Sequence, residues 1–133
     1  MNFDISWLAV LAAALSAFVI GGIWYGPLFG KVWARESGVD PTSRRGKGMI
    51  AIFGATFLLN IVTAAVFAAF LPPGTSVTIA AEAGAAVGIG LVATAYAITY
   101  LFTGRSITLL LIDGGYMTVR LIVFGIVLAL LGR

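Results

Sequence analysis

Four long and predominantly apolar segments, at about 5–25, 49–71, 76–102 and 107–131, account for most of this 133-residue sequence. An α-helix needs about 20 such residues to cross the roughly 30 Å hydrocarbon core of a bilayer. Only 10% of the residues are charged and 61% are hydrophobic, so a soluble fold would expose large apolar patches. We therefore predict an all-α integral membrane four-transmembrane-helix bundle that forms a single transmembrane domain over residues 1–133.

The connection at about 27–48 is the only long one, and its first part is amphipathic. Gly26 and Pro27 should break the first span, after which the apolar and the charged side chains fall largely on opposite faces of a helix. This pattern predicts a short interfacial helix after the first span. The uncharged turn at 72–75 is so short that it predicts an antiparallel hairpin of the second and third spans.

Basic residues are concentrated in that first connection. It holds five of the eight, namely Lys31, Arg35, Arg44, Arg45 and Lys47. Such an excess is typical of cytoplasmic loops, so we expect this loop in the cytoplasm and both termini on the non-cytoplasmic side. Membrane topology accounts for the net charge of +3, and we expect contact with membrane lipids and no nucleic-acid partner.

Several kinds of chemistry require side chains that the sequence lacks. Without cysteine or histidine the chain cannot form disulfides, Cys or His metal sites, or a His-based catalytic triad. We predict no catalytic residues, no metal and no cofactor, and we interpret the chain as a membrane protein that is not an enzyme.

Three ionisable residues lie inside the apolar segments, namely Glu82, Asp113 and Arg120. A charged side chain at the bilayer centre costs roughly 2.5–3.5 kcal/mol on insertion scales, so each should face protein or water. Helical rise places Glu82 and Arg120 at similar depths in the antiparallel third and fourth spans. We therefore expect an ion pair between them, within one chain or between two copies.

Uncharged polar residues extend this candidate site toward the first connection. Asp113 shares a helical face with Tyr116, and Asn60 and Tyr96 lie in neighbouring spans. Such a seam can fasten the helices together by hydrogen bonds, or it can line a water-filled path for a small molecule or ion. The sequence leaves both interpretations open and does not indicate a substrate.

Small residues at four-residue spacing indicate close helix packing. Gly22 and Gly26 form one such pair, and Gly84 and Gly88 form another. A bundle of this size has little interior in which to hide three charges, so we expect a homo-oligomer. The aromatic residues Trp24, Tyr25 and Trp33 are expected near a membrane surface, as part of the interface and packing residues.

Two motifs resemble a known bacterial membrane family, catalogued as domain of unknown function 1761 (DUF1761). The first runs through Gly22, Ile23, Trp24, Tyr25, Pro27, Leu28, Phe29, Gly30 and Trp33. The second comprises Leu111, Ile112, Asp113, Gly114, Gly115 and Tyr116, followed by Gly125. The family often has Asn and Ala where this chain has Asp113 and Gly114. The resemblance implies a small multi-pass protein of the bacterial inner (cytoplasmic) membrane and assigns no activity. It also implies that both motifs form one feature near the cytoplasmic face.

Two functions remain compatible with these residues. The first is an oligomeric channel or transporter with a polar intramembrane path. The alternative is a non-transporting membrane scaffold or accessory subunit that binds itself, a partner protein or lipid. A polar cavity that reaches Asp113 would favour the first hypothesis.

Overall fold

The computed structural model describes residues 1–39 and 47–132, except for the side chain of Lys47. Arg44, Arg45 and most of the predicted polar linker lie outside these residues. The described chain is helical and has no strand, with the order α1 (Trp7–Ile23), η1 (Trp24–Leu28), α2 (Gly30–Ser37), α3 (Lys47–Phe70), α4 (Val77–Val87), η2 (Gly88–Ala93), α5 (Thr94–Thr103) and α6 (Ile107–Leu130).

Four stretches of the described chain are long and apolar enough to cross a membrane, namely Trp7–Leu28, Gly48–Phe70, Val77–Thr103 and Ile107–Leu130. The predicted fold class, including the short helix after the first span, is thereby confirmed. These helices indicate a multi-pass membrane protein.

The helix ends follow local sequence. Ser6, Ser76 and Ser106 each accept a hydrogen bond from the backbone N–H three residues later, at 3.1–3.2 Å, and so cap α1, α4 and α6. Gly38 and Gly104 end α2 and α5 with positive φ of 73° and 70°, a conformation that glycine adopts without strain.

Pro27 does not end the first span as abruptly as expected. Its ring nitrogen has no hydrogen to donate, and the helix widens there into the π-type turn η1, in which the Phe29 N–H donates to the Trp24 carbonyl at 2.9 Å. The span therefore continues three residues beyond the predicted end at Tyr25. The wider turn leads into α2, and it directs Tyr25 into the bundle.

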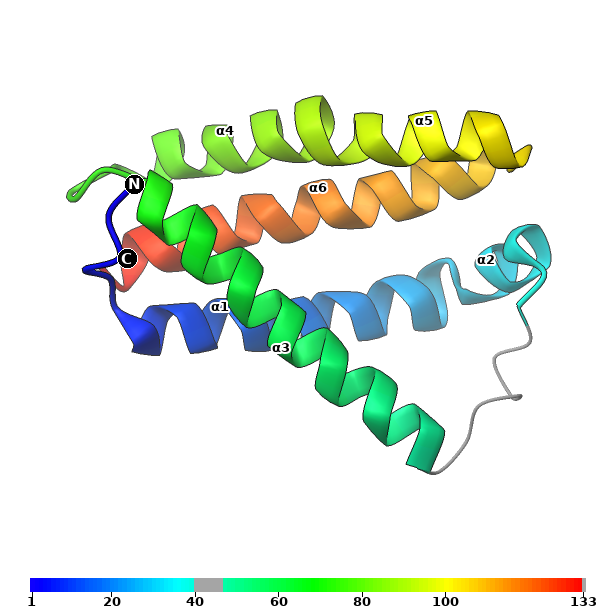
Figure 1. Ribbon diagram of the computed structural model, residues 1–133, viewed down its shortest axis with the longest axis horizontal. Helices are drawn as coiled ribbons and strands as arrows, with labels where there is room; N and C mark the ends of the chain where they lie inside the picture. Colours follow the sequence, from blue (N-terminus) through cyan, green and yellow to red (C-terminus); the bar gives the residue numbers. More distant parts are fainter. Residues whose placement is uncertain (40–46, 133) are drawn as a thin grey trace.

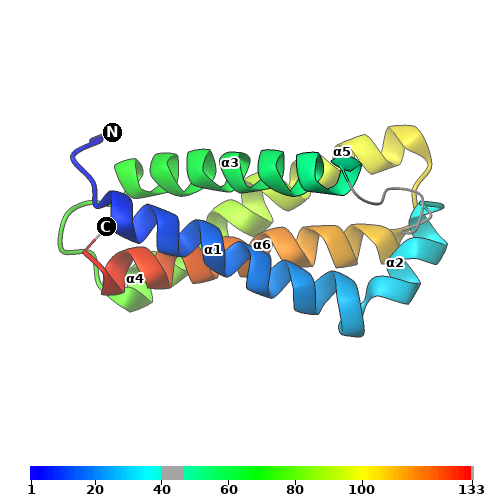
Figure 2. The ribbon, with the colours of Figure 1, turned by 90° about the horizontal axis from the view of Figure 1, so that it is seen from below.

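The chain termini lie together at one end of the bundle, and α2 lies at the other (Figure 1). We call these the termini end and the α2 end. α6 packs against α4 on one side and against α1 on the other, and α1 in turn packs against α3. Figure 2 shows the same arrangement turned by 90°.

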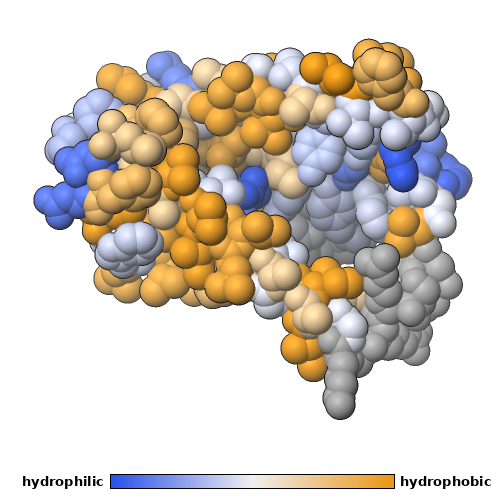
Figure 3. Space-filling view, viewed as in Figure 1, coloured by the Kyte–Doolittle hydropathy of each residue, from blue (hydrophilic) through white to orange (hydrophobic). Residues whose placement is uncertain are grey.

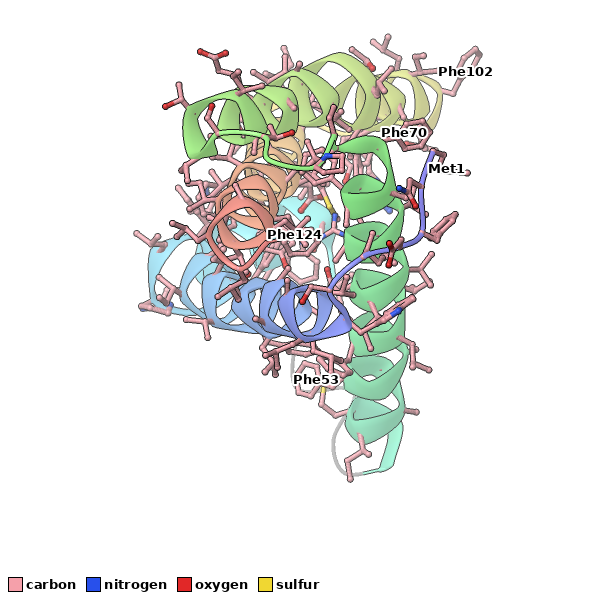
Figure 4. All side chains as sticks on the ribbon, turned by 90° about the vertical axis from the view of Figure 1, so that its left-hand side faces the viewer. Met1, Phe53, Phe70, Phe102 and Phe124 are labelled. Carbon is pink, nitrogen blue, oxygen red and sulfur yellow. The ribbon has the colours of Figure 1, made fainter. Side chains whose placement is uncertain are left out.

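α3 and α4 form the antiparallel return that the short turn predicts, but they do not pack closely against each other. The turn does reverse the chain, but α3 packs mainly on α1 and α4 mainly on α6, so the two helices diverge toward the α2 end (Figure 1). The divergence leaves the third span largely exposed, and Phe102 points away from the bundle while Phe124 lies inside it (Figure 4).

Glycine residues, which have no side chain, let α4 and α6 approach each other closely. A Cβ added at Gly84 would collide with the Leu121 carbonyl, and one added at Gly125 would collide with the Ala80 carbonyl. A Cβ at Gly88 would lie 2.6 Å from the Thr118 Cα. The two backbones therefore touch along three helical turns, and this contact positions the side chains of α6.

Alanine at Gly84 or Gly125 should separate α4 from α6. We expect each substitution to lower the free energy of unfolding by about 1–3 kcal/mol, the usual cost of overpacking, because backbone atoms rather than flexible side chains must move. Gly90→Ala is the matched control in the same span, since a Cβ there meets nothing within 4 Å. Thermal unfolding in detergent measures the difference, and equal stability of Gly84→Ala and Gly90→Ala would contradict the packing.

Candidate functional site

α6 carries two buried polar groups on one face. Asp113 is 8% exposed and Arg120 is 9% exposed. Their separation of seven residues corresponds to about 10 Å along the helix. Asp113 lies toward the α2 end and Arg120 near the middle of α6, so the helix presents two distinct polar centres.

Two tyrosines surround the carboxyl group of Asp113. The Tyr25 hydroxyl donates to Oδ1 at 2.7 Å, and the Tyr100 hydroxyl donates to Oδ2. Tyr25 comes from η1 and Tyr100 from α5, so Asp113 joins three separate segments. Each carboxyl oxygen has its own donor, which offsets much of the cost of removing the group from water.

The first motif encloses this centre. The Trp24 indole N–H donates to the Ile112 carbonyl at 2.9 Å, and the Tyr25 ring packs against Trp33 and Tyr116 with centroids 5.7 and 5.3 Å apart. The two motifs of the sequence thus meet at the α2 end, as the resemblance implied. Tyr25, which was expected near a membrane surface, is half-buried there, and its side chain points into the bundle toward Asp113.

Arg120 forms the second centre with Asn60 from α3. Its Nε donates to the Asn60 Oδ1 at 2.7 Å, and its Nη1 donates to the Met117 sulfur at 3.2 Å. The guanidinium also lies 5.1 Å from the centre of the Phe124 ring, a cation–π contact. The Asn60 amide donates back to the Thr56 carbonyl, so Arg120 rests on a side chain that α3 itself holds in place.

Within one chain, Glu82 and Arg120 do not form the expected ion pair. Glu82 is exposed, whereas the hydrogen bonds of Arg120 go to Asn60 and Met117. Glu82 is two residues from both Ala80 and Gly84, which places it roughly 160° around α4 from the face that contacts α6. Similar depth in the membrane was therefore not enough to pair Glu82 with Arg120. The glycine contact between α4 and α6 turns Glu82 away from the interior of the bundle.

Tyr116 and Tyr96 also belong to the polar seam. The Tyr116 hydroxyl lies between the two centres and donates to the Ala17 carbonyl of α1 at 3.0 Å. The half-buried Tyr96 ring packs edge-on against Tyr100, with centroids 5.7 Å apart. Of the predicted site residues, the structure gathers Asn60, Tyr96, Asp113, Tyr116 and Arg120 and leaves Glu82 outside.

The predicted packing glycines fall into two groups. Gly84 and Gly88 contact α6 as described above. A Cβ added at Gly22 or Gly26 would meet nothing within 4 Å, so this pair makes no close approach to another described helix of the same chain. Both residues line a cavity instead.

Three hollows surround the polar centres. The Asp113 cavity, of about 750 Å³, lies at the α2 end and is lined by Lys31, Thr56, Tyr96 and Asp113 among others. The Asn60 cavity, of about 430 Å³, shares Tyr25, Gly26, Ile52, Phe53 and Thr56 with it and extends to Asn60 and Tyr116. The lateral groove, of about 680 Å³, lies between α3 and α4 and reaches Arg120. Figure 3 shows this face hollowed between α3 and the third span, with hydrophilic surface inside the hollow.

Three of the direct partnerships were not predicted from the sequence. Sequence reasoning named both Asn60 and Arg120 but did not pair them, and it left out Tyr100 as a donor to Asp113. The Thr56, Asn60 and Thr63 stripe on α3 was a usable signal for Asn60. The partnership of Tyr25 with Asp113 depends on the π-type turn at Pro27, which has no simple sequence pattern.

Comparison with known proteins identifies a family for nearly the whole chain. The model of the family described as "Protein of unknown function (DUF1761)" matches residues 8–129. The chain belongs to this family. No curated protein and no solved structure matches the chain. Membership in DUF1761 assigns no activity.

The tyrosine donors of Asp113 should stabilise the fold. Tyr25→Phe and Tyr100→Phe each remove one hydroxyl, and we expect each to lower the free energy of unfolding by about 1–2 kcal/mol, because one carboxyl oxygen loses its donor. Tyr96→Phe is the control, because no described hydrogen bond uses its hydroxyl. Thermal unfolding in detergent tests this, and a Tyr96→Phe loss as large as the other two would refute the assignment.

Removing Asn60 alone should cost more than removing both partners. Asn60→Leu leaves the Arg120 Nε without its acceptor, a loss of about 1.5–3 kcal/mol. Adding Arg120→Met replaces the pair by apolar groups and should recover part of that stability. A double-mutant cycle by thermal unfolding measures the coupling, and additive effects would mean that the hydrogen bond contributes nothing.

Proposed function

We propose that this DUF1761 protein is a small oligomeric transporter or channel whose solute path passes the Asn60–Arg120 hydrogen bond. One observation carries the proposal: Asn60 lines a cavity on the α2 side of that bond, and Arg120 lines the groove on its other side. The two bonded side chains thus line two hollows that lie toward opposite ends of the bundle.

The two cavities on the α2 side of the bond have polar side chains along a mostly apolar lining. Its polar groups are Lys31 near the surface, Tyr96 and Asp113 deeper, and Thr56 and Asn60 farther in. Polar side chains in the membrane interior are costly, so their alignment along one path supports a role in conduction. Volumes of about 430–750 Å³ fall in the range of roughly 300–1,000 Å³ found for small-molecule sites.

Separation of Asn60 from Arg120 would connect the two hollows. Both side chains have other partners, namely the Thr56 carbonyl for Asn60 and the Met117 sulfur with the Phe124 ring for Arg120. Breaking one hydrogen bond therefore leaves neither group without contacts. An arrangement with two states of similar energy is what a gate requires.

A second copy would complete the path. The groove opens sideways between α3 and α4, and only 6% of the most apolar stretch of the third span is buried within the chain. In a membrane this opening meets lipid, and a neighbouring copy packed on the exposed third span would border the groove without filling it. We also propose that the first connection, with Lys31 and Arg35, faces the cytoplasm of a bacterial inner membrane.

Flux measurements with the protein in liposomes test the proposal. We expect proton or ion flux in the unmodified protein, and flux at least tenfold higher in Asn60→Leu and Arg120→Gln, since both weaken the contact that separates the hollows. Glu82→Gln is the matched control, because Glu82 is an intramembrane charge on the opposite face of α4.

Two results would overturn the proposal. One is the absence of flux from folded, correctly assembled protein, and the other is equal flux in Glu82→Gln and Arg120→Gln. The first would favour the scaffold hypothesis, in which the exposed apolar third span binds a partner or lipid.

A further inference from the structure

We propose that the lateral groove binds a single-chain organic anion, with its carboxylate on Arg120 and its hydrocarbon chain directed along α3 toward the termini end. The assignment rests on the proposed transport function, for which this anion would be the cargo. It adds the chemical class of the ligand and the orientation in which it binds.

The groove is apolar except at its base. Apart from Arg120 and Thr63 its lining is hydrophobic, with Val66, Phe67 and Phe70 on α3, and Val87 on α4. The Thr63 hydroxyl already donates to the Leu59 carbonyl of its own helix. The α3 residues that line the groove run from Val62 to Phe70, about 12 Å of helix. The groove is thus mostly apolar, and its α3 wall extends from near the level of Arg120 toward the termini end, as a fatty carboxylate in this orientation requires.

Arg120 is held in place, and the described part of the chain provides it with no counter-ion. Asn60 fixes its Nε, Met117 contacts Nη1, and the Phe124 ring covers one face of the guanidinium. None of these partners is an anion, and among the described residues no carboxyl group forms an ion pair with Arg120. Its Nη2 therefore has hydrogens to donate to a ligand in the groove that it lines. A buried cation fixed in this way matches a carboxylate, which accepts two parallel N–H bonds.

The depth of Arg120 favours a single-chain ligand over a phospholipid. Arg120 is thirteen residues from the start of α6 and ten from its end, or about 20 and 15 Å from the two ends. A phosphate that stays at headgroup level does not reach this depth, given a hydrocarbon core about 30 Å thick. A carboxylate on one chain has no second chain to accommodate and can enter the groove sideways from the membrane.

Photo-crosslinking tests the site independently of transport. The protein is placed in nanodiscs of zwitterionic lipid and exposed to three photoreactive probes with the same ten-carbon chain, a carboxylate, an alcohol and an amine. Mass spectrometry then locates the labelled residues. We expect the carboxylate to label the groove residues of α3 and α4 about tenfold more than the alcohol, because one charge-assisted contact has this effect.

Two variants distinguish the effect of the charge of the groove on labelling from the effect of its shape. Arg120→Gln should abolish the preference for the carboxylate, and Val66→Trp should block all three probes while leaving Arg120 in place. Arg105→Gln is the control, because this exposed cation bonds the Ser37 carbonyl at the α2 end. Unlabelled decanoate should compete with the carboxylate probe, whereas an anionic phospholipid should not.

Three outcomes would overturn the proposal. Equal labelling by all probes would make the groove an ordinary lipid-facing surface, and competition by an anionic phospholipid would make the occupant a lipid headgroup. A disulfide between a cysteine introduced at Glu82 of one copy and a cysteine introduced at Val66 of another, together with no labelling by any probe, would show that the occupant of the groove is a second copy of the chain. Carboxylate binding without flux would retain this site and refute transport, whereas flux without such binding would retain transport and refute this ligand.

Discussion

The hydrocarbon interior of a membrane offers no hydrogen-bond partner to a polar side chain, and this constraint explains most polar contacts in the structure. Thr56 and Thr63 donate to carbonyls of their own helix, and Tyr116 donates to the Ala17 carbonyl across the bundle. Asp113 and Arg120 cannot be satisfied locally, so they recruit tyrosines from η1 and α5 and an asparagine from α3. The helices are therefore joined where their polar groups need partners.

α6 is the helix on which the other three spans depend. Its small residues admit the α4 backbone on one side, and Trp24 and Tyr116 connect it to α1 on the other. α3 has a smaller contact with α6, in which the Asn60–Arg120 hydrogen bond joins the two helices, and α3 diverges from the third span. The divergence produces the lateral groove, so the same packing that stabilises the bundle also opens its side.

Glu82 and Arg120 show how differently one membrane bundle treats two charges. Arg120 contacts Asn60, Met117 and Phe124 and lines a groove, whereas Glu82 faces outward from α4. Both are charged residues within apolar spans, but of the two only Arg120 is buried and contacted by polar and aromatic side chains. Because DUF1761 membership assigns no activity, this contrast is the main reason to place the functional site on α6 rather than on the third span.

The sequence by itself determined the four spans, the capped helix ends, the glycine face of α4 and the presence of Asp113 and Arg120 within the membrane, because length, hydropathy and spacing are local properties. It also carried the family motifs that meet at the α2 end. Only the tertiary structure decided which groups pair. Helix rotation turned Glu82 outward, the π-type turn at Pro27 directed Tyr25 to Asp113, and the divergence of α3 left Asn60 as the partner of Arg120. Depth can be counted along a sequence, but the direction in which a side chain points depends on how each helix packs against its neighbours.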